Sequence, residues 1–439
     1  MRRSFSSILA MVLLVAINGG ASLAATASGD VESPSREALT WDNLEARIKA
    51  NAVAGFSGVI LVVRDGEPVL EAAFGMANRE EGVPNRTDTI FGIGSTPIDF
   101  THVGILMLAQ QGKLSFDDPI MKFFDDLPTD KRGITVEQLM TGRSGLRNFH
   151  GLPSDGNPDH AWIDRDEAMR RIFASELLFE PGSGREHSHS AWGVLAAILE
   201  IVSGESYQDF TEKRIFAPLG MKDTGFYGET YPRERMAVGY GMRSNGKINA
   251  PPYWGPTSWL VLGSGGQVST VPDMYRFVTG MRAGKLLEEE MRDRLLSTWD
   301  GTLAGGSIFG YEIIYTTGPD DMMILISNYN PDGGQSAAVE LGEELAALTL
   351  GRTRPRFSLG VGLDMDMERG LVISQVVPGS AAERDGLKSG DRLISANGKP
   401  LGDDPMAVLA PLLATGEKIE FGVERDGKSM KVGVKPNPR

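Results

Sequence analysis

The sequence predicts an α/β fold for most of the chain, followed by a second, small domain. Apolar runs typical of strands occur near residue 60 and near residue 325, and segments with helical spacing of apolar residues lie between them. We therefore expect one sheet that joins the two ends of the first domain. After residue 356 the chain changes to short apolar runs and Gly-rich turns over roughly 80 residues, which is enough for a domain.

Residues 1–27 have the features of a secretory signal peptide. Arg2 and Arg3 precede an apolar run over 8–17, and small residues follow, with cleavage expected after Ala24 or Ala27. The apolar run is too short to serve as a spanning helix, and no later segment reaches the roughly 20 apolar residues needed. We expect an exported protein without a transmembrane anchor.

The composition limits the cellular compartments and the kinds of partner to be expected. The chain of 439 residues has no cysteine, which excludes disulfides, thiolate catalysis and lipid attachment through cysteine. A bacterial periplasm fits best. The formal net charge of −14 offers no basic surface to nucleic acid or to an anionic membrane, so neither is expected as a partner.

The first domain, expected over 35–350, begins with a helix over 41–50 and a β-hairpin. The hairpin strands are 58–63 and 68–74, joined by the turn "RDGEP". Thr270 should cap a later helix, because Pro272 and Asp273 fall in its first turn. The remaining expected elements are helices from Ser95, over 191–202, 206–216 and 336–350, and hairpin strands over 310–316 and 322–327.

Ser95 lies where an apolar strand-like run gives way to a helix. A serine at this position has unpaired backbone N–H groups and the positive end of the helix dipole beside its hydroxyl, which favours developing negative charge. Pro97 supports the placement, because proline is tolerated in a first helical turn. Ser95 is therefore either an N-cap or a nucleophile, and its surroundings have to decide between them.

Five segments follow one another in the first domain: "DTIFGIGS", "FTHVGILMLAQQGKLSFDDPI", "ITVEQLMTGRSGL", "VSGESYQDFTEKRIFAPLGMKDTGF" and "GGQVSTVPDMYRF". In this order they resemble the serine β-lactamase and D,D-peptidase superfamily, particularly the branch of class C β-lactamases and related esterases. The resemblance implies an antiparallel sheet flanked by helices, a mainly helical lobe, and Ser95 as the nucleophile.

The catalytic motifs of that family are degenerate in this chain. The lysine of the S-x-x-K motif is replaced by Ile98, and His187 and His189 stand at the tyrosine and asparagine positions of the second motif. In the third motif, Ala304 replaces the lysine or histidine. The backbone N–H groups of Ser95 and Ser307 could still form the oxyanion hole, because backbone donors survive a side-chain change.

His187 is the tentative base, because the fold would bring its motif beside Ser95 and an imidazole titrates near neutral pH. His189 or an acidic residue would orient the ring. Asp99 is expected to be a first-turn charge of low pKa and hence a poor base. His102 lies seven residues from Ser95, about 10 Å along a helix, and is expected to be a packed helix residue.

The five histidines lie between positions 102 and 189, and "HSH" has the spacing of a metal pair. Zinc would need further ligands, for which His150, Asp159 and His160 are the candidates. No spacing signature connects them, so we expect neither a metal site nor a cofactor.

Residues 351–356 form a short basic linker, and residues 357–437 resemble a PDZ domain of the kind found in bacterial periplasmic proteases. "SLGVGL" matches the carboxylate-binding loop of that family. The resemblance implies that Leu359, Gly360 and Val361 contact the C-terminal peptide of a partner protein, which would add a strand to the sheet. The alternative is a PDZ domain that packs on its neighbour and binds no peptide.

Two functions follow from the sequence. The first is a serine hydrolase acting on the ester, amide or peptide carbonyl of a small-molecule or peptide substrate through Ser95. The second is a catalytically inactive protein of the same fold that serves as a peptide-binding adaptor or scaffold in the cell envelope, because Ile98 cannot relay a proton.

Overall fold

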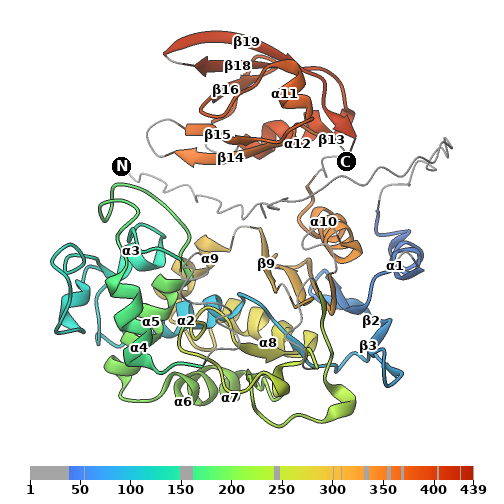
Figure 1. The fold of residues 1–439 in the computed structure, drawn as a ribbon. Helices are drawn as coiled ribbons and strands as arrows, with labels where there is room; N and C mark the ends of the chain where they lie inside the picture. The colour runs from blue at the N-terminus through green and yellow to red at the C-terminus, as the bar shows by residue number, and fades with distance from the viewer. Residues whose placement is uncertain are drawn as a thin grey trace. The chain divides into compact units, whose positions relative to one another are not determined.

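The computed structural model describes residues 39–438 except 54, 149–161, 242–247, 300, 308, 331–335, 353–356, 367–369, 403–404 and 426 (Figure 1). The expected signal peptide and most of the expected linker lie outside the described residues. The chain divides into two compact units, Asn43–Gly342 and a second that contains Glu343 to the C-terminus. This boundary falls within a helix, a few residues before the position that the sequence suggests.

A five-stranded antiparallel sheet forms the centre of the first unit, in the order β2-β1-β11-β10-β9. β1 pairs with β11 from the other end of the unit, with Gly58 opposite Ser327, so the sheet joins the two ends of the domain as predicted. Both strands are apolar runs without alternation, which is typical of strands covered on both faces. The strands are β1 (Gly58–Arg64), β2 (Glu67–Phe74), β9 (Thr302–Gly306), β10 (Glu312–Thr316) and β11 (Met322–Ser327).

The predicted turn between β1 and β2 is confirmed. Asp65 and Gly66 both have positive φ angles, 52° and 80°, which is the combination of a two-residue type I′ hairpin turn. Aspartate and glycine adopt that conformation more readily than other residues, so "DG" fixes the turn locally.

Helices cover the sheet and build the helical lobe (Figure 1). α8 contacts β1 and β11 on one face, while α2 contacts α5, α6 and α9. Gly342 of α10 lies against β10, where a Cβ atom would meet Ile314 Cδ1 at 2.5 Å. The helices are α1 (Leu44–Val53), α2 (Pro97–Gln110), α3 (Val136–Met140), α4 (Arg165–Ala174), α5 (His189–Ser203), α6 (Tyr207–Thr211), α7 (Ala217–Leu219), α8 (Val271–Arg282), α9 (Glu289–Thr298) and α10 (Ala337–Thr349).

Two expected helix positions need adjustment. The helix expected from Ser95 begins at Pro97, and the helix expected over 206–216 is interrupted, because Glu212–Phe216 forms a π-helical turn between α6 and α7. The cap at Thr270 is confirmed, since its side chain accepts the Asp273 N–H at 3.2 Å.

A small three-stranded sheet leads to Ser95. It has the order β5-β8-β6, with Ile93 N–H also donating to the Gln267 carbonyl. Shorter pairs complete the unit. These strands are β3 (Met76–Asn78), β4 (Val83–Pro84), β5 (Phe91–Gly92), β6 (Gly225–Phe226), β7 (Tyr240–Gly241), β8 (Gln267–Ser269) and β12 (Tyr329–Asn330).

The second unit has its own sheet and core. The strand order is β14-β15-β16-β18-β19, with β17 paired to β16, and β14 lies at the edge. A separate cluster of buried residues, among them Ile373, Leu409 and Phe421, fills its interior. The elements are β13 (Phe357–Ser358), β14 (Val361–Asp366), β15 (Gly370–Val376), α11 (Ala381–Asp385), β16 (Arg392–Ala396), β17 (Lys399–Pro400), α12 (Pro405–Thr415), β18 (Ile419–Arg425), β19 (Lys428–Val434) and β20 (Asn437–Pro438).

Within the described ranges, no helix combines the length and the apolar character needed to cross a membrane.

Candidate active site

Ser95 occupies a tight turn between β5 and α2. Gly94 has a φ angle of +52°, and Thr96 takes the N-cap position without a side-chain cap, so Ser95 itself does not cap the helix. The residue is half-buried. Among the described residues, its backbone N–H makes no hydrogen bond. The turn therefore presents both a hydroxyl and a free N–H at the start of a helix.

Edge strand β9 lies directly beside this turn. A Cβ atom added to Gly305 would lie 3.0 Å from Ser95 N and 3.1 Å from Thr96 N, and one added to Gly94 would lie 2.6 Å from Gly306 N. Side chains larger than hydrogen would close this gap. The glycines allow the strand to approach the Ser95 N–H.

The expected donor at Ser307 is already paired. Its N–H donates to the Tyr311 carbonyl at 2.9 Å, and its carbonyl accepts from Gly310, because Ser307 closes the β9–β10 hairpin. In an antiparallel pair, successive residues alternate between facing the partner strand and facing away. Gly306 therefore directs its backbone N–H away from β10, and its closeness to Gly94 agrees with this.

A buried carboxyl group lies behind the same strand. Glu312 on β10 stands opposite Gly306, is 3% exposed and accepts a hydrogen bond from Asn330 Nδ2 at 2.9 Å. Burial raises the pKa of Glu312 to about 7. The hydrogen bond from Asn330 opposes this rise but is the smaller effect. This group was not predicted, since a lone Glu in an apolar strand is its only signal in the sequence.

His187 and His189 lie at the start of α5. Their rings make an edge-to-face contact with centroids 5.0 Å apart, and Ser188 between them caps the helix by accepting the Ala191 N–H at 3.2 Å. Desolvation lowers the pKa of His187 although the residue is exposed, which favours the neutral imidazole that a base requires. Among the described residues, no hydrogen bond joins Ser95 to either histidine.

The segment before His187 is held against the segment after α3. Glu186 N–H donates to the Gly142 carbonyl and Gly182 N–H to the Arg143 carbonyl, both at 2.8 Å. Arg185 lies near Arg143, and desolvation together with that neighbouring charge lowers the pKa of Arg185. Neither guanidinium forms an ion pair with a described residue. This part of the site thus favours negative charge.

Asp99 differs from the expectation that it is a low-pKa capping charge. Its carboxylate accepts the Tyr315 hydroxyl, and desolvation raises the pKa of Asp99 to about 6. The Tyr315 bond and the nearby Trp299 indole oppose this rise without offsetting it. The expected low pKa of Asp99 was wrong because burial in the folded protein outweighs the helix dipole. The local sequence does not reveal that burial.

His102 is a packed helix residue, as predicted, and Ile98 is packed as well. His102 is 8% exposed and its ring lies 6.0 Å from that of Trp192; burial lowers its pKa to about 4. Ile98 is half-buried and packs against the main core. Neither can take a proton from Ser95 near neutral pH.

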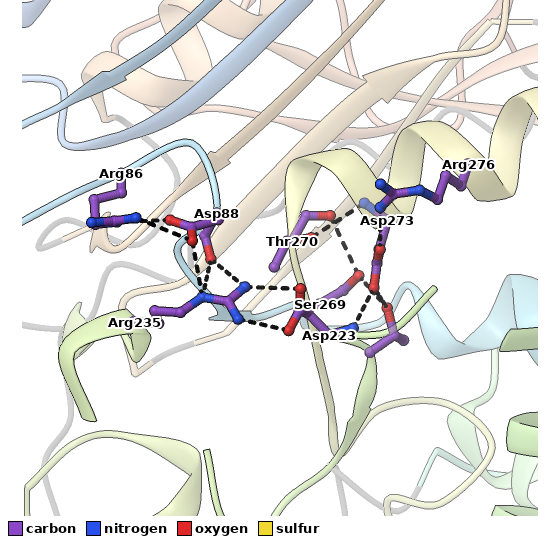
Figure 2. A network of polar contacts seen from close by, with 9 residues as sticks. Arg86, Asp88, Asp223, Arg235, Ser269, Thr270, Asp273 and Arg276 are labelled. Carbon is purple, nitrogen blue, oxygen red and sulfur yellow. Dashed lines mark hydrogen bonds and ion pairs between the residues drawn. The ribbon is translucent and has the colours of Figure 1, made fainter. Parts of the chain in front are cut away.

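A polar network holds the strands that lead to Ser95 (Figure 2). Arg235 donates to the Asp88 carbonyl from Nε at 3.1 Å and from Nη2 at 2.9 Å, and forms an ion pair with Asp223 at 2.8 Å. Asp273, which is fully buried, accepts the Asp223 N–H and the Thr224 hydroxyl. The network fixes the segment before β5 to the segment before β6 and to the start of α8.

Of the possible zinc ligands, His150, Asp159 and His160 lie outside the described residues. Within the part of the chain that the structure describes, no three His, Asp or Glu side chains are grouped as a metal site would require.

In the second unit, the predicted carboxylate-binding loop connects β13 to β14. Gly360 has a φ angle of +73°, and its N–H donates to Ser358 Oγ at 3.1 Å. Leu359 is 4% exposed, and Val361 begins edge strand β14. A Cβ atom on Gly360 would lie 2.2 Å from Ser380 Cβ, so this position requires glycine. Half-buried apolar side chains of β14 and α12, including Val361, Leu363 and Leu412, pack against the same core.

The comparisons with known proteins agree with this architecture. The family model described as β-lactamase matches residues 42–346, and a PDZ-domain model matches residues 372–425. The chain is 33% identical to the Bacillus subtilis protein PbpX over 252 residues, 57% of this chain and 61% of that protein. It is 32% identical to esterase EstB of Burkholderia gladioli over 196 residues, 42% of this chain and 49% of that protein. The chain thus spans about half to three fifths of the length of these relatives.

Among solved structures, the crystal structure of D-amino acid amidase from Ochrobactrum anthropi complexed with L-phenylalanine amide superimposes with a TM-score of 0.58 at 25% identity. The match covers 70% of this chain and 96% of the amidase. The family model spans more than two thirds of this chain, and the fold matches. The chain therefore belongs to the β-lactamase family, and a PDZ domain follows the β-lactamase domain.

Proposed function

We propose that this protein is an exported serine hydrolase that cleaves an ester, amide or peptide carbonyl through Ser95, and that its PDZ domain binds the C-terminus of a partner. One observation carries the proposal: the Ser95 N–H, at the start of α2, has no partner among the described residues and faces the glycine-lined edge of β9. Such a backbone donor suits a developing oxyanion.

The reaction would begin with attack of Ser95 Oγ on the substrate carbonyl carbon. The hydroxyl proton would pass to the neutral imidazole of His187, which His189 would orient. The oxyanion would accept hydrogen bonds from the N–H groups of Ser95 and Gly306, the latter taking the place expected for Ser307. Collapse of the tetrahedral intermediate would expel the alcohol or amine with a proton from His187, and water would then release the acyl group.

The inactive adaptor is the second candidate, and one observation favours it: among the described residues, no side-chain base lies within hydrogen-bond distance of Ser95. A serine hydroxyl without a base is a weak nucleophile at neutral pH. In that case the β-lactamase domain would supply a cleft or scaffold, and the PDZ domain would supply the function.

Intact mass measurement of the mature chain separates the two candidates. We expect a fluorophosphonate to add one phosphonyl group to the wild-type protein and none to Ser95→Ala. Penicillin should add nothing, because Ile98 and Ala304 replace the residues that the family's β-lactamases use. Absence of a Ser95-dependent phosphonyl adduct would favour the adaptor.

The PDZ proposal is tested on the ligand rather than on Gly360, whose replacement would clash with Ser380. An array of peptides with free C-termini, each paired with its C-terminal amide, is probed with the full chain. We expect binding that requires the free carboxylate and depends on the last residues. Equal binding of acids and amides would support a PDZ domain without a peptide function.

The periplasmic location is tested by fractionating cells of the native host.

A further inference from the structure

A cavity of about 480 Å³ opens on the first unit. Its walls come from the segment before α4, from α6, from the turn after β6 and from the loop over 252–259. Neither Ser95 nor His187 lines it.

Aromatic side chains form much of the wall. Trp162, Tyr227 and Trp259 line the cavity, and Trp162 is 58% exposed, which is unusual for so large an apolar side chain. Two hydrogen bonds hold the tryptophan segments together. Trp259 N–H donates to the Ile163 carbonyl at 3.2 Å, and Ile163 N–H donates to Ser258 Oγ at 3.3 Å. These two hydrogen bonds connect the segments that carry Trp162 and Trp259.

Among the described residues, the charged groups that line the wall are both acidic, namely Asp164 and Glu229. Both carboxylates are fixed by other bonds: Asp164 accepts the Glu167 N–H at 2.9 Å, and Glu229 accepts the Tyr231 hydroxyl at 2.9 Å. The Gln208 side chain also lines the wall and makes no hydrogen bond with a described residue.

The face of an aromatic ring carries partial negative charge and attracts a cation placed above it. The two acidic side chains, which form no ion pair with a described basic residue, add to the same preference. A neutral sugar would also stack on tryptophan, but it would leave both negative charges uncompensated. We propose that this cavity, lined by Trp162, Tyr227, Trp259, Asp164 and Glu229, is a binding site for an organic cation of the alkylammonium class.

The test compares choline with 3,3-dimethylbutan-1-ol, which has the same shape without the charge. Binding to the full-length protein is followed by tryptophan fluorescence and by calorimetry. We expect saturable binding of choline and at least roughly 10-fold weaker binding of the alcohol. Binding should weaken as salt increases, because charges near the surface are screened.

Variants locate the site. Trp162→Ala and Glu229→Gln should each weaken choline binding by about 3-fold or more, whereas Trp162→Phe should restore most of it. Asp164→Asn retains the helix cap, since asparagine caps as well as aspartate, and should also weaken binding. Glu290→Gln in α9, outside the cavity, is the matched control and should have no effect.

Absence of saturable choline binding would overturn the proposal. Equal affinity for the neutral alcohol would also overturn it, as would binding of chitotriose in place of choline, which would identify a saccharide site. Choline binding unchanged in Trp162→Ala, Glu229→Gln and Asp164→Asn would place the cation elsewhere on the protein and contradict the assignment.

Discussion

The hydroxyl of Tyr315 donates a hydrogen bond to the carboxylate of Asp99, one helical turn from Ser95. Tyr315 lies on β10 and is 1% exposed, so the pair connects α2 to the sheet within the core. Desolvation raises the pKa of Asp99 to about 6, and it raises the pKa of Tyr315 as well. An ionised Asp99 is therefore costly for the folded state.

We predict that Asp99→Asn stabilises the protein at about pH 8 and has little effect at about pH 4. The pKa of Asp99 is higher in the folded state than in the unfolded state. Between about pH 4 and pH 6 the folded state therefore retains a proton on Asp99 that the unfolded state has lost. Above that window the wild type bears the full cost of the buried charge, on the order of 3 kcal/mol. Urea unfolding of both proteins at the two pH values measures the difference.

Tyr315→Phe is the companion variant. It leaves the carboxylate without its donor, so we expect destabilisation at about pH 8 that diminishes toward about pH 4, when Asp99 is protonated. A stability difference independent of pH for both variants would mean that Asp99 does not titrate in this range.

The network in Figure 2 should contribute more to stability than surface ion pairs do. Arg235 is 21% exposed and binds both Asp88 and Asp223, so Arg235→Met leaves a carboxylate and a carbonyl without partners. We expect a loss of about 2–4 kcal/mol in the free energy of unfolding.

Arg233→Met is the matched control for that measurement. Arg233 lies two residues away and pairs with Glu81 at the surface, where its side chain is 65% exposed. We expect a loss of at most about 0.5 kcal/mol. Similar losses for the two arginines would show that the network has no special role.

Gly305→Ala tests whether the approach of β9 to Ser95 matters for reactivity. The new Cβ atom would lie 3.0 Å from Ser95 N and from Ile93 O, and these backbone atoms have little room to move. We predict at least a roughly 10-fold slower phosphonylation of Ser95, because displaced donors stabilise an oxyanion less well. Gly133→Ala serves as the control, since no atom lies within 4 Å of its added Cβ. Equal rates for the two variants would show that the approach of β9 to Ser95 does not affect the reactivity of Ser95.

Much of the fold could be predicted because its signals lie in short stretches of the sequence. The apolar runs of β1 and β11, the "DG" turn and the Thr270 cap each specify their own conformation. The site was predicted less completely. The hydrogen bond from the Ser307 N–H to the Tyr311 carbonyl depends on the register of the hairpin. The raised pKa of Asp99 depends on its burial beside β10. Neither property is encoded in neighbouring residues.

The central claim is that Ser95 is a nucleophile activated by His187, and the pH dependence of Ser95 phosphonylation tests it most directly. We predict that the wild-type rate rises with pH and levels off at a pKa below the ordinary value for histidine, as the desolvated His187 loses its proton. His187→Ala should not show this titration, and its rate should be lower by a factor of about 10² or more. A wild-type rate and pH profile retained in His187→Ala, or an adduct retained in Ser95→Ala, would contradict the account.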